Sequence, residues 1–77
     1  MNNRKGAIDS LIIHIQCEPK YISYLNGIFE GYEWLAIIRT VDPKAGITAL
    51  ISSPDLEDDL REILIHLKEE VGLKILD

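Results

Sequence analysis

Hydrophobic residues recur with two different spacings along this chain of 77 residues. Over residues 10–17 they alternate imperfectly with polar residues, which is typical of a β-strand with one buried face. From Pro19 to about Glu30 they recur every three or four residues, which is the spacing of an amphipathic helix. Proline suits the first turn of a helix because its missing N–H would have no intrahelical partner there. We therefore predict a strand followed by a helix that ends near Gly31.

The middle of the chain predicts a β-hairpin. Residues Trp34 to Val41 form a second apolar and β-branched run, and Ile47 to Ser52 form a third. The residues between them, Asp42 to Gly46, are of the types that form turns. The pattern leaves two solutions open for the residues of the second strand that face the core: Trp34 with Ile38, or Leu35 with Ile37.

A second helix follows this hairpin. Ser53, Pro54 and Asp55 supply a capping residue, a proline for the first turn and an acid that suits the positive end of a helix. Gly72 is expected to end the helix in the left-handed conformation, and residues 73–77 to form a short last strand or a tail along the sheet edge. The apolar stripe of this helix consists of Leu56, Leu60, Ile63, Leu64, Leu67 and Val71.

The order β-α-β-β-α, with a final strand, is the split βαβ arrangement of the ferredoxin-like sandwich. We therefore predict an α+β fold in which two helices cover one face of an antiparallel sheet with strand order 4-1-3-2. Residues 1–8 are polar and lack periodicity, so we expect a mobile N-terminal tail and a single domain over residues 9–77.

Composition excludes several classes of function. The chain carries 13 acidic and 8 basic residues, for a formal net charge of -5, which repels nucleic acids and anionic membranes. Its one cysteine cannot form an intramolecular disulfide. The apolar run Leu11 to Ile15 is too short for a signal peptide or a membrane span. We expect a cytoplasmic protein that binds neither nucleic acid nor membrane.

The second face of the sheet, which no helix covers, is predicted to be partly apolar. The alternation places Ile12 and His14 of the first strand, together with Thr48 and Leu50 of the third, on this face. Exposed apolar patches usually mark interfaces. Gly27 lies opposite the apolar stripe of the first helix, where it costs up to about 1 kcal/mol relative to alanine. We therefore predict a homodimer whose interface includes Ile12, His14, Gly27 and Leu50.

A small anionic ligand is predicted at the end of the sheet where the first helix begins. Gln16, Lys20 and Arg39 approach this end in the predicted topology, together with the Asp42 to Gly46 loop. The free N–H groups of the helix start and the Arg39 guanidinium would donate hydrogen bonds to the anion. We expect neither a cofactor nor a metal, because the chain has no CxxC, HxxxH or HxH spacing.

A small enzyme that uses Arg39 with Cys17 or with a carboxylate is the alternative function. Cys17 lies beside the start of a helix, where the helix dipole can favour a thiolate. The alternation of residues 10–17 places Cys17 among the core residues, however. No histidine is positioned as a base for nucleophilic catalysis. Glu30 and Glu33 lie near one another, but the sequence supplies no shielded pocket for acid–base chemistry.

The run Pro19 to Glu33, PKYISYLNGIFEGYE, and its continuation from Leu35 to Pro43, LAIIRTVDP, resemble a family of short uncharacterised bacterial proteins classed as a domain of unknown function. This resemblance implies no activity. The element order is also similar to that of ACT-type regulatory domains, which pair through their sheets and bind amino acids near the first strand-to-helix turn. Together these features favour a dimerising, non-enzymatic module that binds a small ligand or a protein partner.

Overall fold

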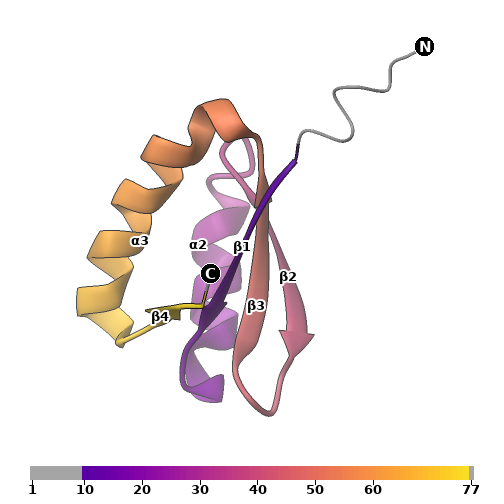
Figure 1. Cartoon of the computed structure of the whole chain (residues 1–77). Helices are drawn as coiled ribbons and strands as arrows, with labels where there is room; N and C mark the ends of the chain where they lie inside the picture. Colours follow the sequence, from indigo (N-terminus) through magenta and orange to yellow (C-terminus); the bar gives the residue numbers. More distant parts are fainter. Residues whose placement is uncertain (1–9, 77) are drawn as a thin grey trace.

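The computed structural model describes residues 10–76 (Figure 1), so the predicted tail over residues 1–8 lies outside the described residues. The strands are β1 (Leu11–Gln16), β2 (Ile37–Asp42), β3 (Ile47–Ser52) and β4 (Lys74–Ile75). The helices are α2 (Ile22–Glu30) and α3 (Glu57–Val71), and each follows a short 3₁₀ turn, η1 (Pro19–Tyr21) or η2 (Pro54–Leu56).

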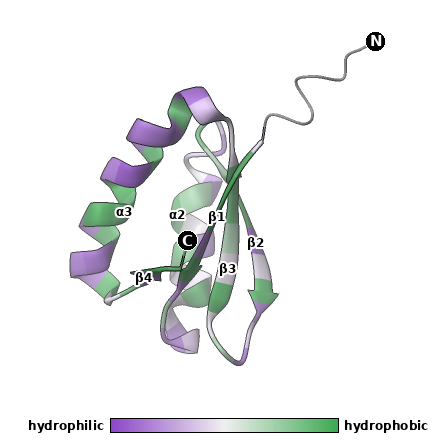
Figure 2. Ribbon diagram, in the orientation of Figure 1, coloured by the Kyte–Doolittle hydropathy of each residue, from purple (hydrophilic) through white to green (hydrophobic). Residues whose placement is uncertain are grey.

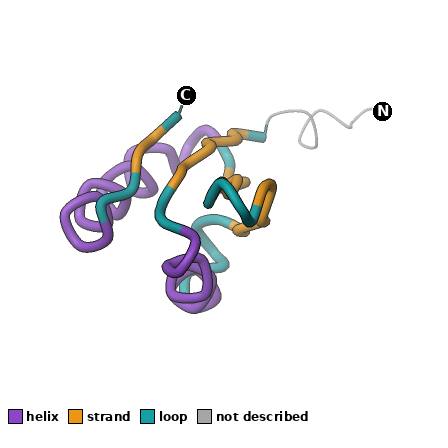
Figure 3. The backbone as a smooth tube through the Cα atoms, turned by 90° about the horizontal axis from the view of Figure 1, so that it is seen from below, coloured by secondary structure: helices purple, strands orange, loops and turns teal. Residues whose placement is uncertain are grey.

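The four strands form one antiparallel sheet in the order β2-β3-β1-β4. Both helices lie on the same side of this sheet (Figures 1 and 3). The prediction of an α+β fold with this strand order is therefore confirmed, and the arrangement is compatible with a ferredoxin-like fold. The loop between β2 and β3 lies at the end of the sheet where β1 leads into η1.

The helices begin and end where their sequences predict. A proline occupies the first turn of η1 and of η2, and three acids follow in the first turn of α3, where they complement the helix dipole. Gly31 ends α2 with right-handed backbone angles. Gly72 ends α3 at φ 73°, the left-handed conformation that glycine adopts without steric cost, and its N–H donates to the Lys68 carbonyl oxygen.

The core lies between the helices and the inner face of the sheet. Helix residues that are almost fully buried pack against Ile13 and Ile15 of β1 and Leu50 of β3. Figure 2 shows that the apolar sides of both helices turn toward the sheet. The buried helix residues are Leu25, Phe29, Leu60, Leu64 and Leu67.

Strand β2 begins later than predicted, because residues 31–35 form turns instead of extended chain. The N–H groups of Leu35 and Ala36 both donate to the carbonyl oxygen of Tyr32, and the Ser52 hydroxyl donates to the Leu35 carbonyl oxygen. These turns bury Leu35 and leave Trp34 exposed, whereas Ile38 contacts the core from the strand itself. Each of the two predicted solutions is therefore half correct, since strand alternation does not extend through a turn.

Neither α2 nor α3, nor any other helix within residues 10–76, has both the length and the apolar character needed to cross a membrane.

Candidate functional site

Both helices of residues 10–76 lie on one side of the sheet, and the other face carries a row of three isoleucines. Ile13 and Ile15 point into the core, so their neighbour Ile12 points to the opposite side of β1. Ile12 lies opposite Ile51 of β3, and Ile51 lies opposite Ile37 of β2. The three side chains therefore cross β2, β3 and β1 side by side. We call Ile37, Ile51 and Ile12 the isoleucine row.

Two further rows complete this face. In the second, Arg39 and His14 lie on either side of Ala49, and in the third, Ile47 lies opposite Gln16 of β1. Lys74 of β4 is the pairing partner of Gln16. The open face is defined by these three rows and Lys74: Ile12, His14, Gln16, Ile37, Arg39, Ile47, Ala49, Ile51 and Lys74.

The open face is apolar along β3 and along the isoleucine row, and it carries a cation on each of its two outermost strands. Strand β3 contributes only isoleucine and alanine, whereas Arg39 and Lys74 lie on β2 and β4. Ile12 and Ile37 remain 49% and 57% exposed. Exposed apolar residues gathered on one face usually mark a protein–protein interface.

The prediction that Leu50 lies on the open face is wrong. Leu50 is 0% exposed and pairs with the core residue Ile13, so it faces the helices. Thr48, two residues earlier, faces the same side and is equally buried. Because β3 carries apolar residues on both of its sides, alternation alone could not decide which side meets the helices.

The four residues predicted for the interface do not share one surface. Ile12 and His14 lie on the open face, and Leu50 lies in the core. Gly27 is exposed on α2, and a Cβ added there would meet no atom within 4 Å. Since α2 packs on the opposite side of the sheet, one twofold contact through the open face cannot also contain Gly27 (Figure 3).

The β2–β3 loop is tied to the end of β1 by two hydrogen bonds. The side-chain amide of Gln16 donates to the Ala45 carbonyl oxygen over 2.8 Å, and the Cys17 N–H donates to the Gly46 carbonyl oxygen over 2.9 Å. The structure therefore places this loop beside the start of the first helical segment, which is where the sequence analysis located a ligand site.

The three residues proposed to hold an anion are nevertheless spread apart. The Lys20 ammonium lies 3.7 Å from a Glu18 carboxylate oxygen and 5.3 Å from the centre of the Tyr21 ring. The Tyr21 N–H, which was expected to be free, donates to the Glu18 carbonyl oxygen. Arg39 is offset from Gln16 by two strands and two residues, roughly 12 Å between backbones. An anion held by all three residues stays a prediction.

The sequence of this chain matches the model of a known protein family. The model for a domain of unknown function, DUF4911, matches residues 15–71, from the end of β1 to the end of α3. The chain belongs to the DUF4911 family. A search of curated proteins found no match, and a search of solved structures found none either.

In this DUF4911 domain the candidate nucleophile is protected from reaction. The Cys17 side chain is 6% exposed, and burial, together with the nearby Glu18 carboxylate, raises the pKa of its thiol. The raised pKa disfavours the thiolate that nucleophilic chemistry requires. Cys17 also belongs to the core, whereas Arg39 lies on the open face, so the structure does not bring this pair together.

The remaining candidates for chemistry in the DUF4911 domain are dispersed. Within residues 10–76, no group of three His, Cys, Asp or Glu side chains comes close enough to hold a metal ion. Gln16 and Cys17 line a shallow cavity of about 290 Å³ with Glu18, Gly72 and Lys74, and neither Lys20 nor Arg39 is among its lining residues.

Sequence reasoning missed most of the apolar residues of the open face. Placing Thr48 and Leu50 on the open face implied that Ile47, Ala49 and Ile51 face the helices, and the side of Ile37 was left open. A signal was present, because Ile47, Thr48, Ala49, Leu50 and Ile51 form an uncharged run with few polar atoms on either side. Such a run is typical of a strand covered on both faces.

Proposed function

We propose that this DUF4911 domain is a non-enzymatic interaction module that forms a homodimer through its open face. The isoleucine row is the observation that carries the proposal, because three large apolar side chains lie in register on a face that the helices leave uncovered. The ACT-like element order supports a regulatory role for such a pair by analogy. The exposed apolar residues of the open face favour a protein partner over the small anionic ligand, whose three predicted residues lie apart.

The size of the open face suits a reversible dimer. Three strands of six residues, about 4.8 Å apart and about 3.4 Å per residue, together with the two residues of β4, give a face of roughly 16 by 20 Å. Pairing two such faces buries on the order of 650–850 Å², which is the size of weak, transient interfaces. We therefore expect a dissociation constant in the micromolar range.

Charge opposes this dimer and gives it a recognisable salt dependence. Each copy carries a net charge of -5, so two copies repel one another at low ionic strength. Salt screens this repulsion, while the apolar contact between the isoleucine rows does not depend on charge. Arg39 and Lys74 lie on the outer strands, where they stay hydrated at the rim. The dimer should therefore tighten as the salt concentration rises.

Sedimentation velocity at protein concentrations from about 1 to about 100 µM tests the proposal in the expected affinity range. The unaltered protein should dimerise, and Ile12→Asp should raise the dissociation constant at least about tenfold, because it places a charge in the apolar contact. Ile65→Asp is the matched control, since Ile65 is an equally exposed isoleucine at 58% but lies on α3. It should leave dimerisation unchanged.

Two results would contradict the proposal. One is a monomer at the highest concentration, and the other is loss of the dimer in Ile65→Asp with retention in Ile12→Asp. Leu50→Asp is unsuitable for this test because Leu50 is buried in the core, and a buried unpaired charge would unfold the monomer.

A further inference from the structure

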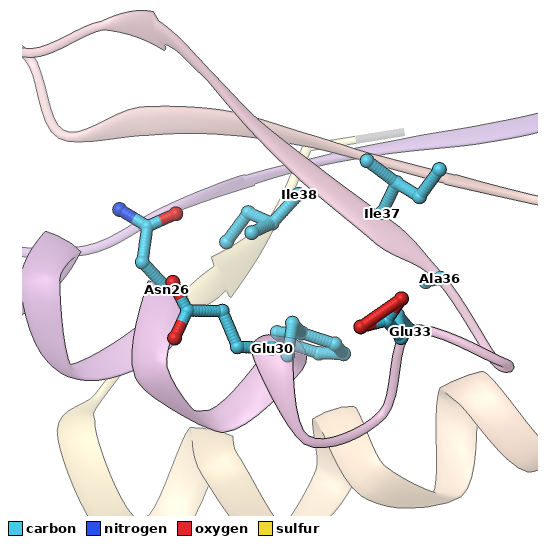
Figure 4. Close-up of a pocket in the computed structure, with 7 residues that line it drawn as sticks. Asn26, Glu30, Glu33, Ala36, Ile37 and Ile38 are labelled. Carbon is cyan, nitrogen blue, oxygen red and sulfur yellow. The ribbon is translucent and has the colours of Figure 1, made fainter.

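A groove of about 380 Å³ lies between α2 and the start of β2, on a different part of the molecule from the centre of the open face. Figure 4 shows Asn26 and Glu30 of α2 on one side, Ile38 of β2 on the other and Glu33 from the connecting turn at one end. Phe29, Ala36, Ile37 and Ile38 supply its apolar surface, so the groove borders the isoleucine row at Ile37. The groove therefore combines an apolar surface with two carboxylates.

The groove lies beside an edge of the sheet that no other strand of residues 10–76 pairs with. Strand β2 is the outermost strand of the sheet and pairs with β3 along one side. An outermost strand presents backbone N–H and C=O groups that can pair with a further strand. Five of the six residues of β2 are exposed. A peptide in the extended conformation can therefore add to this edge and place every second side chain in the groove.

The charge of the groove indicates which side chains it would accept. Within residues 10–76, neither Glu30 nor Glu33 forms an ion pair with a lysine, arginine or histidine. A lysine or arginine can lay its aliphatic stem on apolar surface while its charged end reaches a carboxylate. Phe29 and Ile38 provide that surface, while Glu30 lies along one side of the groove and Glu33 at one end.

We propose that an extended peptide with basic residues at every second position binds this groove as an additional strand on β2. The basic side chains enter the groove and reach Glu30 and Glu33. The intervening residues point to the other side of the sheet, beside Ile37, where apolar side chains would lengthen the isoleucine row.

A second copy of this chain fits the same edge poorly. Antiparallel pairing of two β2 strands would place both grooves on the same side of a continuous sheet. The Glu30 and Glu33 carboxylates of the two copies would then face one another, and like charges in that position repel. Charge complementarity therefore favours a basic peptide over self-association at β2, and leaves the open face available for the dimer.

The test follows backbone amide signals of the ¹⁵N-labelled protein by NMR during titration with a blocked hexapeptide, acetyl-(Lys-Val)₃-amide. We expect the largest shifts within residues 26–38 and no shifts with acetyl-(Glu-Val)₃-amide. The double variant Glu30→Gln/Glu33→Gln should weaken binding at least about tenfold. The control Glu62→Gln/Glu69→Gln removes the same charge from exposed positions on α3 and should change the affinity less than about twofold.

Strand addition has its own readout. The N–H groups of alternate residues in a strand point to opposite sides, so the central valine and the central lysine are N-methylated in two separate peptides. The peptide that loses a donor to β2 should bind at least about tenfold more weakly, and the other should not.

Three results would overturn the proposal: an equal loss of affinity in the α3 control, undiminished binding of both N-methylated peptides, or equally tight binding of n-butylammonium in the groove. Each is independent of sedimentation of Ile12→Asp, so failure here would leave the proposed dimer standing.

Discussion

Gly46 lies so close to Cys17 that no other residue fits at its position. Its carbonyl oxygen accepts the Cys17 N–H over 2.9 Å, and a Cβ added to Gly46 would lie 1.8 Å from the Cys17 carbonyl oxygen. Its φ of 75° is also in the left-handed region, where side chains are unfavourable. This contact connects the β2–β3 loop to the start of the first helical segment.

Gly46→Ala should cost roughly 4 kcal/mol or more in the free energy of unfolding, because the added methyl overlaps backbone atoms that cannot move aside. Urea unfolding followed by circular dichroism measures this loss. Gly72→Ala is the matched control: its φ is 73°, but its Cβ would meet no atom within 4 Å. It should cost only about 1–2 kcal/mol. Equal losses in the two variants would show that the contact with Cys17 is unimportant.

Gly27→Ala should instead stabilise the protein by up to about 1 kcal/mol, because alanine is the better helix former and the site has open space for its methyl. Thermal unfolding at low protein concentration measures the gain in the monomer. Sedimentation of the same variant examines the predicted interface. Because α2 lies on the other side of the sheet from the open face, the variant should dimerise as the unaltered protein does. Poorer dimerisation would show that Gly27 contacts the partner.

The sequence predicted the elements of this fold better than it predicted which residues face the core. The stripes of α2 and α3 each have one apolar side, so their orientation follows from spacing alone. Strand β3 has apolar residues on both sides, so the assignment of Leu50 depended on pairing with Ile13, which alternation does not reveal. The position of Leu35 depended on turns at Tyr32 that interrupt the strand pattern.

Thr48→Val should raise the free energy of unfolding by about 1 kcal/mol, because the Thr48 hydroxyl is fully buried and has no hydrogen-bond partner among residues 10–76. Valine keeps the branched shape and removes the unpaired oxygen. Chemical denaturation of both proteins measures the difference. Thr40→Val, on the neighbouring strand, is the control: Thr40 is exposed, so the change should stay within about 0.5 kcal/mol. A destabilised Thr48→Val would mean that the hydroxyl has a partner.

The raised pKa of the Cys17 thiol predicts a loss of stability in alkaline solution. Above the ordinary pKa of 9.0, the thiol of the unfolded chain loses its proton while the buried thiol keeps it. The unfolded state then binds fewer protons, so the free energy of unfolding falls with rising pH until the pKa of the folded state is passed. Urea unfolding between about pH 7 and 10 should show a steeper decline for the unaltered protein than for Cys17→Ala. If the free energy of unfolding falls equally with pH in both proteins, Cys17 is not the cause of the decline.

The candidate sites differ in how far the sequence could define them. Ile12 and His14 were placed on the open face because β1 has one clearly apolar side. The groove escaped prediction, because Glu30 and Glu33 gain an apolar neighbourhood only when the turn brings Ala36 and Ile38 against Phe29. These residues follow no helix or strand spacing along the chain, so only the folded structure shows that they are neighbours.

Because β3 is apolar on both sides, it is prone to aggregate whenever a neighbouring strand detaches from it. Residues 47–51 are uncharged, rich in β-branched residues and free of proline, which is the composition of segments that stack into amyloid-like fibrils. In the native sheet β1 and β2 occupy both of its edges, so no other chain can reach its backbone. Conditions that detach β2 from β3 would expose the edge of β3 as a template for aggregation. The lifetime of the protein in a cell would then depend on how often β2 detaches.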